Sequence, residues 1–280
     1  MKKITIITTG DLPEAYFLAG YLINKKHDVQ FVNLKRRNLE SSIVVVKRLA
    51  KNRGIIYLID YLLGRLVNPL FQKSTVVPFP EVDDQYIDCI QRGTNYIIVN
   101  DLNNEETVSR IRSFMPDVML LSGAPIIKRQ LYSIPKKLTV NRHLGLAPKY
   151  RGSDTPLWAL SRKDYDNIGF TIHLVSDRVD GGDILSQGRY PIDKDETYSQ
   201  FLAGLQRMAS QAYLNVIEKI IADEDVLRQP QTETFAPFPP AGLTTKIQAR
   251  FAYRRYDGPG GGRPVPHRSP PEADQDPASG

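Results

Sequence analysis

Cysteine is almost absent from this sequence of 280 residues, with Cys89 as its only occurrence. A single cysteine cannot form an internal disulfide, which fits a reducing compartment, and it argues against a cysteine–histidine nucleophilic enzyme. The charged start is followed by an apolar run that ends at Gly10 and Asp11, too early for a signal peptide. The sequence therefore predicts a cytoplasmic protein.

A glycine-rich dinucleotide fingerprint is also missing. Residues 3–8 have the pattern of a buried strand, residues 11–24 that of a helix with Pro13 in its first turn, and residues 29–34 that of a second strand. This start predicts an α/β protein with a parallel sheet, whose ligands collect at the carboxyl ends of the strands. Because only Gly10 occupies the first turn, binding of NAD or FAD is disfavoured.

No zinc-finger spacing and no RNA-binding aromatic signature occur in the chain. The formal charge of +6 at pH 7 attracts anions such as nucleotides and phosphorylated sugars, but the basic residues are dispersed. Arg250, Arg254 and Arg255 are more typical of a solvated face than of a nucleic-acid contact. We therefore expect a small anionic substrate and no nucleic acid.

The hydrophobic fraction of 41% is enough for one large domain with an extension. Further strands are predicted at 96–99, 118–121 and 168–175, and further helices at 105–114 and 198–221. Prolines and threonines then predict an extended C-terminal arm, with a short helix at 246–256. The predicted units are a catalytic domain at 1–225, the arm at 226–256 and a disordered tail at 257–280, which is rich in Gly and Pro.

The segment 39–71 is helical in character. Apolar residues expected near one face are Ile55, Tyr57, Leu58, Leu62 and Leu66. Asp60 and Arg65 interrupt the apolar run and argue against a membrane span. The plain interpretation is a core helix or a subunit contact, which leaves a homodimer open. The alternative is a surface that docks on a membrane or a lipid-linked substrate.

Polar side chains with catalytic chemistry gather around two of the predicted strands. Asn141 and His143 follow a strand that ends at residue 140, and strand alternation turns both the same way. Asp180 lies in a tight Asp-Gly-Gly turn after the strand 168–175. An amide suits a developing oxyanion, an imidazole moves protons near neutral pH, and a carboxylate orients the imidazole. Since no serine or cysteine nucleophile is obviously placed beside them, the three favour acyl transfer without a covalent enzyme intermediate.

The whole stretch resembles the folate-dependent formyltransferase family, which includes glycinamide ribonucleotide and methionyl-tRNA formyltransferases. In that family an Asn-x-His precedes a Leu-Pro-x-Tyr-x-Gly loop, a strand with a histidine and an Asp-Gly-Gly turn. These features fall here on Asn141, His143, Pro148, Tyr150, Gly152, His173, Asp180, Gly181 and Gly182. The resemblance covers roughly the first four fifths of the chain and is strongest between residues 114 and 187.

This resemblance implies a Rossmann-like formyltransferase fold with a mostly parallel sheet, helices on both faces and a short C-terminal extension. It implies that Asn141, His143 and Asp180 are catalytic, with His173 behind them, and that no metal is needed. The residues implied to bind 10-formyltetrahydrofolate are Gly123, Ala124, Pro125, Ile126, Asp177 and Val179. Those expected to bind the amine substrate are Gly10, Arg142, Tyr150 and Arg151.

The chain departs from the family pattern at Arg142, where isoleucine is usual, and in the loop 144–148, which lacks the usual serine. The amine acceptor is inferred by elimination. The first turn resembles the phosphate loop of the purine enzymes poorly, and the residues after Asp225 are too few for the C-terminal barrel of the tRNA enzymes. A nucleotide-linked amino sugar fits better, and an amino acid or antibiotic precursor remains open.

Other functions stay open beside this one. The chain could hydrolyse 10-formyltetrahydrofolate, with water in place of the amine, or bind folate without turnover. A metal hydrolase built on His143, His173, Asp180 and Asp183 is disfavoured, because their spacing matches no metal signature.

Overall fold

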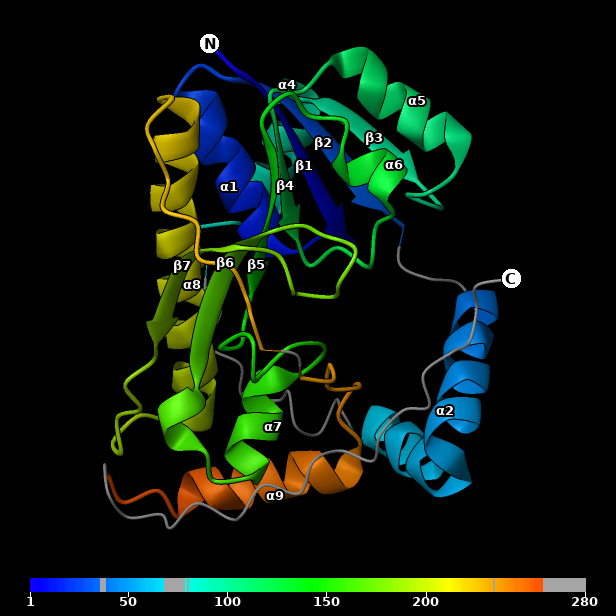
Figure 1. Cartoon of the computed structure of the whole chain (residues 1–280), viewed down its shortest axis with the longest axis vertical. Coiled ribbons are helices and arrows are strands. Elements are labelled where there is room, and N and C mark those ends of the chain that lie inside the picture. Colours follow the sequence, from blue (N-terminus) through cyan, green and yellow to red (C-terminus); the bar gives the residue numbers. More distant parts are fainter. Residues whose placement is uncertain (36–38, 68–78, 80, 234, 259–280) are drawn as a thin grey trace.

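The computed structural model describes residues 1–35, 39–67, 79, 81–233 and 235–258 (Figure 1). Within them, seven strands form one sheet in the order β3-β2-β1-β4-β5-β6-β7. Of the predicted disordered tail, residues 259–280 lie outside the described part of the chain, as do residues 68–71 at the end of the predicted helical segment.

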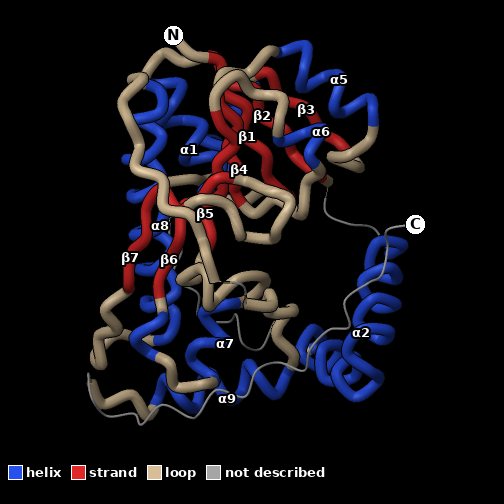
Figure 2. Tube along the Cα trace, viewed as in Figure 1, coloured by secondary structure: helices blue, strands red, loops and turns tan. Residues whose placement is uncertain are grey.

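The sheet is mostly parallel, as predicted. Its parallel strands are β1 (Lys3–Thr9), β2 (Asp28–Leu34), β3 (Asn95–Val99), β4 (Val118–Ser122) and β5 (Leu138–His143). The strand β6 (Gly169–Leu174) is antiparallel to β5, and β7 (Ile184–Arg189) is antiparallel to β6. Every residue of β4 is buried, because helices cover both faces of a parallel sheet (Figure 2). The sheet therefore presents the carboxyl ends of its parallel strands at one common edge.

Helices lie on both faces, which confirms the predicted layering. One face packs against α1 (Pro13–Asn24), α4 (Asp84–Gly93) and α8 (Tyr198–Ile221), and the other against α5 (Glu105–Phe114) and α6 (Arg129–Tyr132). The helix α4 was not predicted from the sequence. This short helix begins at Asp83, whose carboxylate accepts a hydrogen bond from the backbone N–H of Tyr86 at 2.8 Å.

A third apolar cluster joins the C-terminal residues to the rest of the protein. The short helix α7 (Thr155–Ser161) packs against α9 (Leu243–Arg254), which begins before the predicted residue 246. A 3-10 turn, η1 (Tyr165–Asn167), follows α7. Phe238 lies at the centre of this cluster, with its ring 5.4 Å from that of Tyr150 and 5.3 Å from that of Trp158.

The long helix α2 (Leu39–Leu66) buries only part of the predicted apolar face. Gly54 interrupts the helix with φ 82° and ψ 168°. Beyond it, Leu58 is buried, but Ile55, Leu62 and Leu66 are exposed. Most of the predicted face is therefore not part of the core, because only the side of the helix that carries Leu58 packs against α9.

Replacing Phe238 with alanine should lower the free energy of unfolding by roughly 3 kcal/mol, because it opens a cavity between Tyr150 and Trp158. Leu227, which is 83% exposed, provides the matched control, and L227A should change stability little. Urea unfolding of the 280-residue chain measures both. Equal effects of the two variants would contradict a packed contact between the C-terminal residues and the body.

Candidate active site

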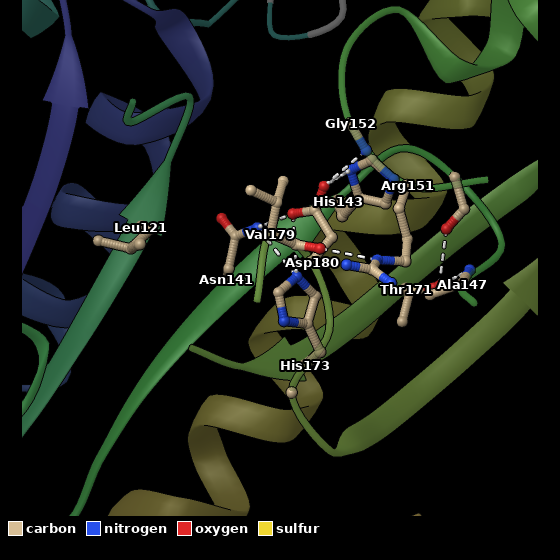
Figure 3. Close-up of polar contacts among 12 residues, drawn as sticks. Leu121, Asn141, His143, Ala147, Arg151, Gly152, Thr171, His173, Val179 and Asp180 are labelled. Atoms are coloured by element: carbon tan, nitrogen blue, oxygen red, sulfur yellow. Dashed lines mark hydrogen bonds and ion pairs between the residues drawn. The ribbon is translucent and has the colours of Figure 1, made fainter. Parts of the chain in front are cut away.

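The site lies where β5 meets β6. In the antiparallel register, Asn141 stands opposite His173 and His143 opposite Thr171. Asn141 and His143 are two residues apart on one strand, so their side chains point to the same side of the sheet. His143 of β5 and His173 of β6 therefore lie next to each other on one side of the sheet (Figure 3).

Asp180 is the residue on which these side chains converge. Its Oδ2 accepts a hydrogen bond from the backbone N–H of Gly152 at 2.8 Å, and its Oδ1 lies 3.4 Å from Asn141 Nδ2. The same carboxylate lies 3.6 Å from His143 Nδ1 and 3.4 Å from His173 Nε2. The structure thus brings together all three residues predicted to be catalytic, with His173 beside them.

Backbone carbonyls fix the tautomers of both histidines. His143 Nε2 lies 2.7 Å from the carbonyl oxygen of Tyr150, and His173 Nδ1 lies 2.7 Å from that of Leu174. Since a carbonyl can only accept, each of these nitrogens carries the proton. His143 Nδ1 is then the basic nitrogen facing Asp180, and His173 Nε2 accepts from Asn141 Nδ2 at 3.1 Å. His173 therefore orients the amide of Asn141.

Burial sets the charge state of this group. Loss of hydration lowers the pKa of His143 below its ordinary 6.5, although the facing Asp180 opposes the shift. For Asp180, burial alone would raise the pKa, but the imidazoles of His143 and His173, once protonated, and the hydrogen bond from the N–H of Gly152 lower it well below 3.8. At neutral pH the site holds a carboxylate beside a neutral imidazole that can accept a proton at Nδ1.

Two glycines allow the loop after β5 to close around His143. Gly152 has φ +96°, and a Cβ there would lie 2.3 Å from the carbonyl oxygen of Phe238. A Cβ on Gly145 would lie 2.5 Å from His143 Nε2. Side chains at these positions would displace the N–H that holds Asp180 or the imidazole itself.

A cavity of about 340 Å³ opens beside these residues. Its lining includes Asn141, His143, His173 and Asp180. It also includes every residue that the family resemblance assigned to the formyl donor: Gly123, Ala124, Pro125, Ile126, Asp177 and Val179. The predicted catalytic and donor-binding residues therefore share one cavity, which we name the donor cavity.

A second cavity of about 310 Å³ shares Gly123, Arg142 and Leu144 with the first, and we name it the acceptor cavity. Arg142 points to the other face of the sheet from its neighbours and forms a buried ion pair with Glu14 at the start of α1. Glu14 Oε1 also accepts a hydrogen bond from the hydroxyl of Ser122 at 3.0 Å. Within the described residues, Arg142 Nη1 is buried without a hydrogen-bond partner.

The other predicted substrate residues lie elsewhere. The ring of Tyr150 belongs to the third apolar cluster, and its hydroxyl donates to Asp164 at 2.7 Å. Arg151 donates through Nε to the carbonyl of Val179 at 2.7 Å. The described linings of the two cavities do not include Gly10, Tyr150 or Arg151. Tyr150 and Arg151 instead support the site. The carbonyl of Tyr150 accepts from His143, and Arg151 binds the turn that carries Asp180.

Sequence reasoning missed Glu14 and the polar network under the loop after β5. Thr171 donates to the carbonyl of Gly145 at 2.6 Å and accepts from the N–H of Ala147 at 3.0 Å, while Gln187 donates to the carbonyl of Ala147 at 2.7 Å. This network supplies hydrogen bonds to a loop that lacks the usual serine. Among the described residues, no cluster of three or more His, Cys, Asp or Glu side chains could hold a metal ion.

Residues 83–217, just under half of the chain, match the model of the formyl transferase family. A methionyl-tRNA formyltransferase from Leifsonia xyli subsp. xyli is 28% identical over 176 residues, which cover 62% of this chain and 56% of that protein. The chain spans about half the length of the curated relatives it matches.

Solved structures share the fold. A sugar N-formyltransferase from Shewanella sp FDAARGOS_354 aligns with a TM-score of 0.56 and 14% identity, over 90% of this chain and 88% of that one. A glycinamide ribonucleotide transformylase from Symbiobacterium toebii aligns with a TM-score of 0.55 and 14% identity, over 81% and 91%. The predicted Rossmann-like formyltransferase fold is confirmed.

The buried neutral state of His143 predicts a pH dependence of stability. Because its pKa is lower in the folded chain than the unfolded 6.5, the unfolded chain binds a proton there first. The free energy of unfolding should therefore fall as the pH drops from about 7.5 to about 5.5. In H143Q this fall should be smaller, as measured by urea unfolding across that range.

His27 is the matched control for this experiment, because burial also lowers its pKa and it lies far from the site in sequence. H27Q measures how much of the pH dependence of the free energy of unfolding comes from His27. A slope that H143Q leaves unchanged would contradict a neutral, buried His143.

Proposed function

We propose that this protein transfers a formyl group from 10-formyltetrahydrofolate to the primary amine of a nucleotide-linked amino sugar. One observation carries the proposal. The side chains of Asn141, His143 and Asp180 line the same cavity as the six residues that the family resemblance assigns to the formyl donor. The match of residues 83–217 to the formyl transferase family supports the reaction class, while the acceptor rests on the second cavity.

The donor cavity suits the donor chemically. Its volume of about 340 Å³ falls within the range of small-molecule sites. Leu121, Ile127 and Val175 supply apolar walls for a flat ring, and the loop residues Gly123 and Ala124 bring backbone close to it. The donor supplies a formyl carbon that an amine can attack. Our assignment places that carbon beside Asn141 and His143.

Each polar residue then has one task. The amide N–H of Asn141 donates to the oxygen that gains negative charge, for which it turns from His173 or Asp180. His143 takes a proton from the attacking amine at Nδ1. The new N–H faces the carboxylate of Asp180, 3.6 Å away, which stabilises the imidazolium. The same N–H can return the proton to the leaving nitrogen.

The acceptor cavity favours hydroxyl groups. Arg142 was expected to hold a substrate phosphate, but Glu14 neutralises its charge. A phosphate would meet a carboxylate as well as a guanidinium. A hydroxyl both donates and accepts, so it matches the unpartnered Arg142 Nη1 beside the Glu14 carboxylate. We assign this pair to hydroxyls of the acceptor sugar, which leaves its nucleotide to bind nearer the surface.

Three expectations from the sequence stay predictions. An anionic substrate follows from the net charge of +6 and from a nucleotide-linked acceptor. A homodimer and a cytoplasmic location have no further support beyond the sequence. Hydrolysis of the donor and folate binding without turnover remain alternatives, and the experiment below separates them from transfer.

The test is a formyl-transfer assay with 10-formyltetrahydrofolate and a panel of nucleoside-diphosphate-linked amino sugars. Tetrahydrofolate and formylated sugar should form in equal amounts, as followed by absorbance and mass spectrometry. Tetrahydrofolate released without any amine would indicate the hydrolase instead. D180N should lower kcat by about a hundredfold or more, because the imidazolium loses its carboxylate. Its affinity for a stable donor analogue, measured by calorimetry, should stay close to that of the wild type.

A double variant separates the acceptor site from the donor site. R142M with E14Q removes the pair without leaving one charge buried alone. It should raise the KM of the acceptor sugar about tenfold and change donor affinity much less, although Arg142 also lines the donor cavity. Full transfer by D180N, or no donor binding by folded wild type, would contradict the proposed function. An unchanged KM in the double variant would contradict only the acceptor assignment.

A further inference from the structure

An apolar stripe runs along the outer side of α2. It consists of Ile55, Ile56, Ile59, Leu62, Leu63 and Leu66, which are between 40% and 82% exposed. Successive residues of a helix are about 100° apart, so these six fall within an arc of about 120°. Contiguous exposed apolar side chains of this kind mark an interaction surface rather than chance exposure. We name this surface the α2 stripe.

The opposite side of α2 is fixed to the protein. Tyr57 donates through its hydroxyl to the carbonyl of Pro240, and Lys246 Nζ donates to the carbonyl of Gly64 at 3.0 Å. Gly64 lies so close to α9 that a Cβ there would be 2.7 Å from the backbone nitrogen of Leu243. The helix is therefore held against α9 by one side, which points the stripe outward. Figure 1 shows α2 beside the end of α9 and away from the sheet.

The charges near the stripe are positive. Lys47, Lys51 and Arg53 precede it, and Arg65 flanks it. Asp60 is the only acidic residue between 47 and 66. Its carboxylate turns toward α9, where it accepts hydrogen bonds from the N–H and the hydroxyl of Thr244 at 2.9 and 2.7 Å. The outward apolar stripe thus lies in a segment whose other charges are basic, while its single acid is occupied.

We propose that the α2 stripe docks the protein on an anionic phospholipid bilayer. The apolar side chains enter the boundary between headgroups and acyl chains, and the basic residues meet the anionic headgroups. Residues 55–66 span about 18 Å as a helix, short of the roughly 30 Å of a bilayer core. No helix in the described residues is long and apolar enough to cross a membrane. The helix therefore lies in the plane of the interface.

A second copy of the chain fits the same surface less well. Two stripes packed face to face would bring Arg53 and Arg65 of both copies together without an acidic partner, since Asp60 is turned to Thr244. Anionic lipids neutralise these charges. The proposal is independent of the formyl-transfer reaction.

The test is co-sedimentation of the full chain with vesicles of equal parts phosphatidylserine and phosphatidylcholine. Binding should be strong, should weaken as ionic strength rises, and should be much weaker to vesicles of phosphatidylcholine alone. I56S with L66S should lower the partition coefficient at least about tenfold. R53Q with R65Q should lower it about tenfold on anionic vesicles only.

Matched controls lie away from the stripe. Leu227 is 83% exposed, like Ile56 at 82%, and L227S should leave vesicle binding unchanged. Lys26 and Lys194 are exposed cations, and K26Q with K194Q should have a smaller effect than R53Q with R65Q. Because the stripe residues are exposed, their variants should keep the unfolding midpoint of the wild type.

Two results would overturn the proposal. One is a folded wild type that does not sediment with anionic vesicles, or sediments equally well after I56S with L66S. The other is a dimer in sedimentation velocity that the stripe variants dissociate, in a protein that binds no vesicles. That result would assign the stripe to a second copy of the chain.

Discussion

The buried carboxylate of Asp180 is the constraint on which the site depends. A buried charge is costly unless hydrogen bonds or opposite charges stabilise it. Here the N–H of Gly152 and the amide of Asn141 donate to the carboxylate, the rings of His143 and His173 lie beside it, and Arg151 holds the preceding carbonyl of Val179. The loop after β5 and the turn after β6 therefore hold each other in place through one side chain.

The mixed sheet explains why two cavities meet at this point. The parallel strands end at one edge, where ligands collect, and β6 then returns antiparallel to place His173 opposite Asn141. Alternation along β5 turns Asn141 and His143 toward the donor cavity and Arg142 toward Glu14. One short strand thus lines the first cavity with Asn141 and His143 and reaches the second with Arg142, to which we assign the reaction and the acceptor.

Local sequence patterns were enough to predict most of the helices and strands. The helices α5 and α8 were predicted at their observed bounds, because each has a clear apolar period and a capping residue before it. The resemblance to a family also singled out Asn141, His143 and Asp180, which the structure brings together, and their catalytic role stays a prediction. The pair of Arg142 and Glu14 was not found, because 128 residues separate its members and only the folded sheet brings them together. The role of the α2 face stayed open in the sequence, because periodicity shows which residues align, and it does not show which side is buried.

The most direct measurement of the central claim is nitrogen NMR of the full chain labelled in its histidines, with His143 assigned from H143Q. Our account predicts that at pH 7 His143 is neutral, carries its proton on Nε2, and becomes charged only below the ordinary 6.5. A base facing the carboxylate of Asp180 through Nδ1 is then ready to accept a proton. An imidazolium at pH 7, or a proton on Nδ1, would contradict the account.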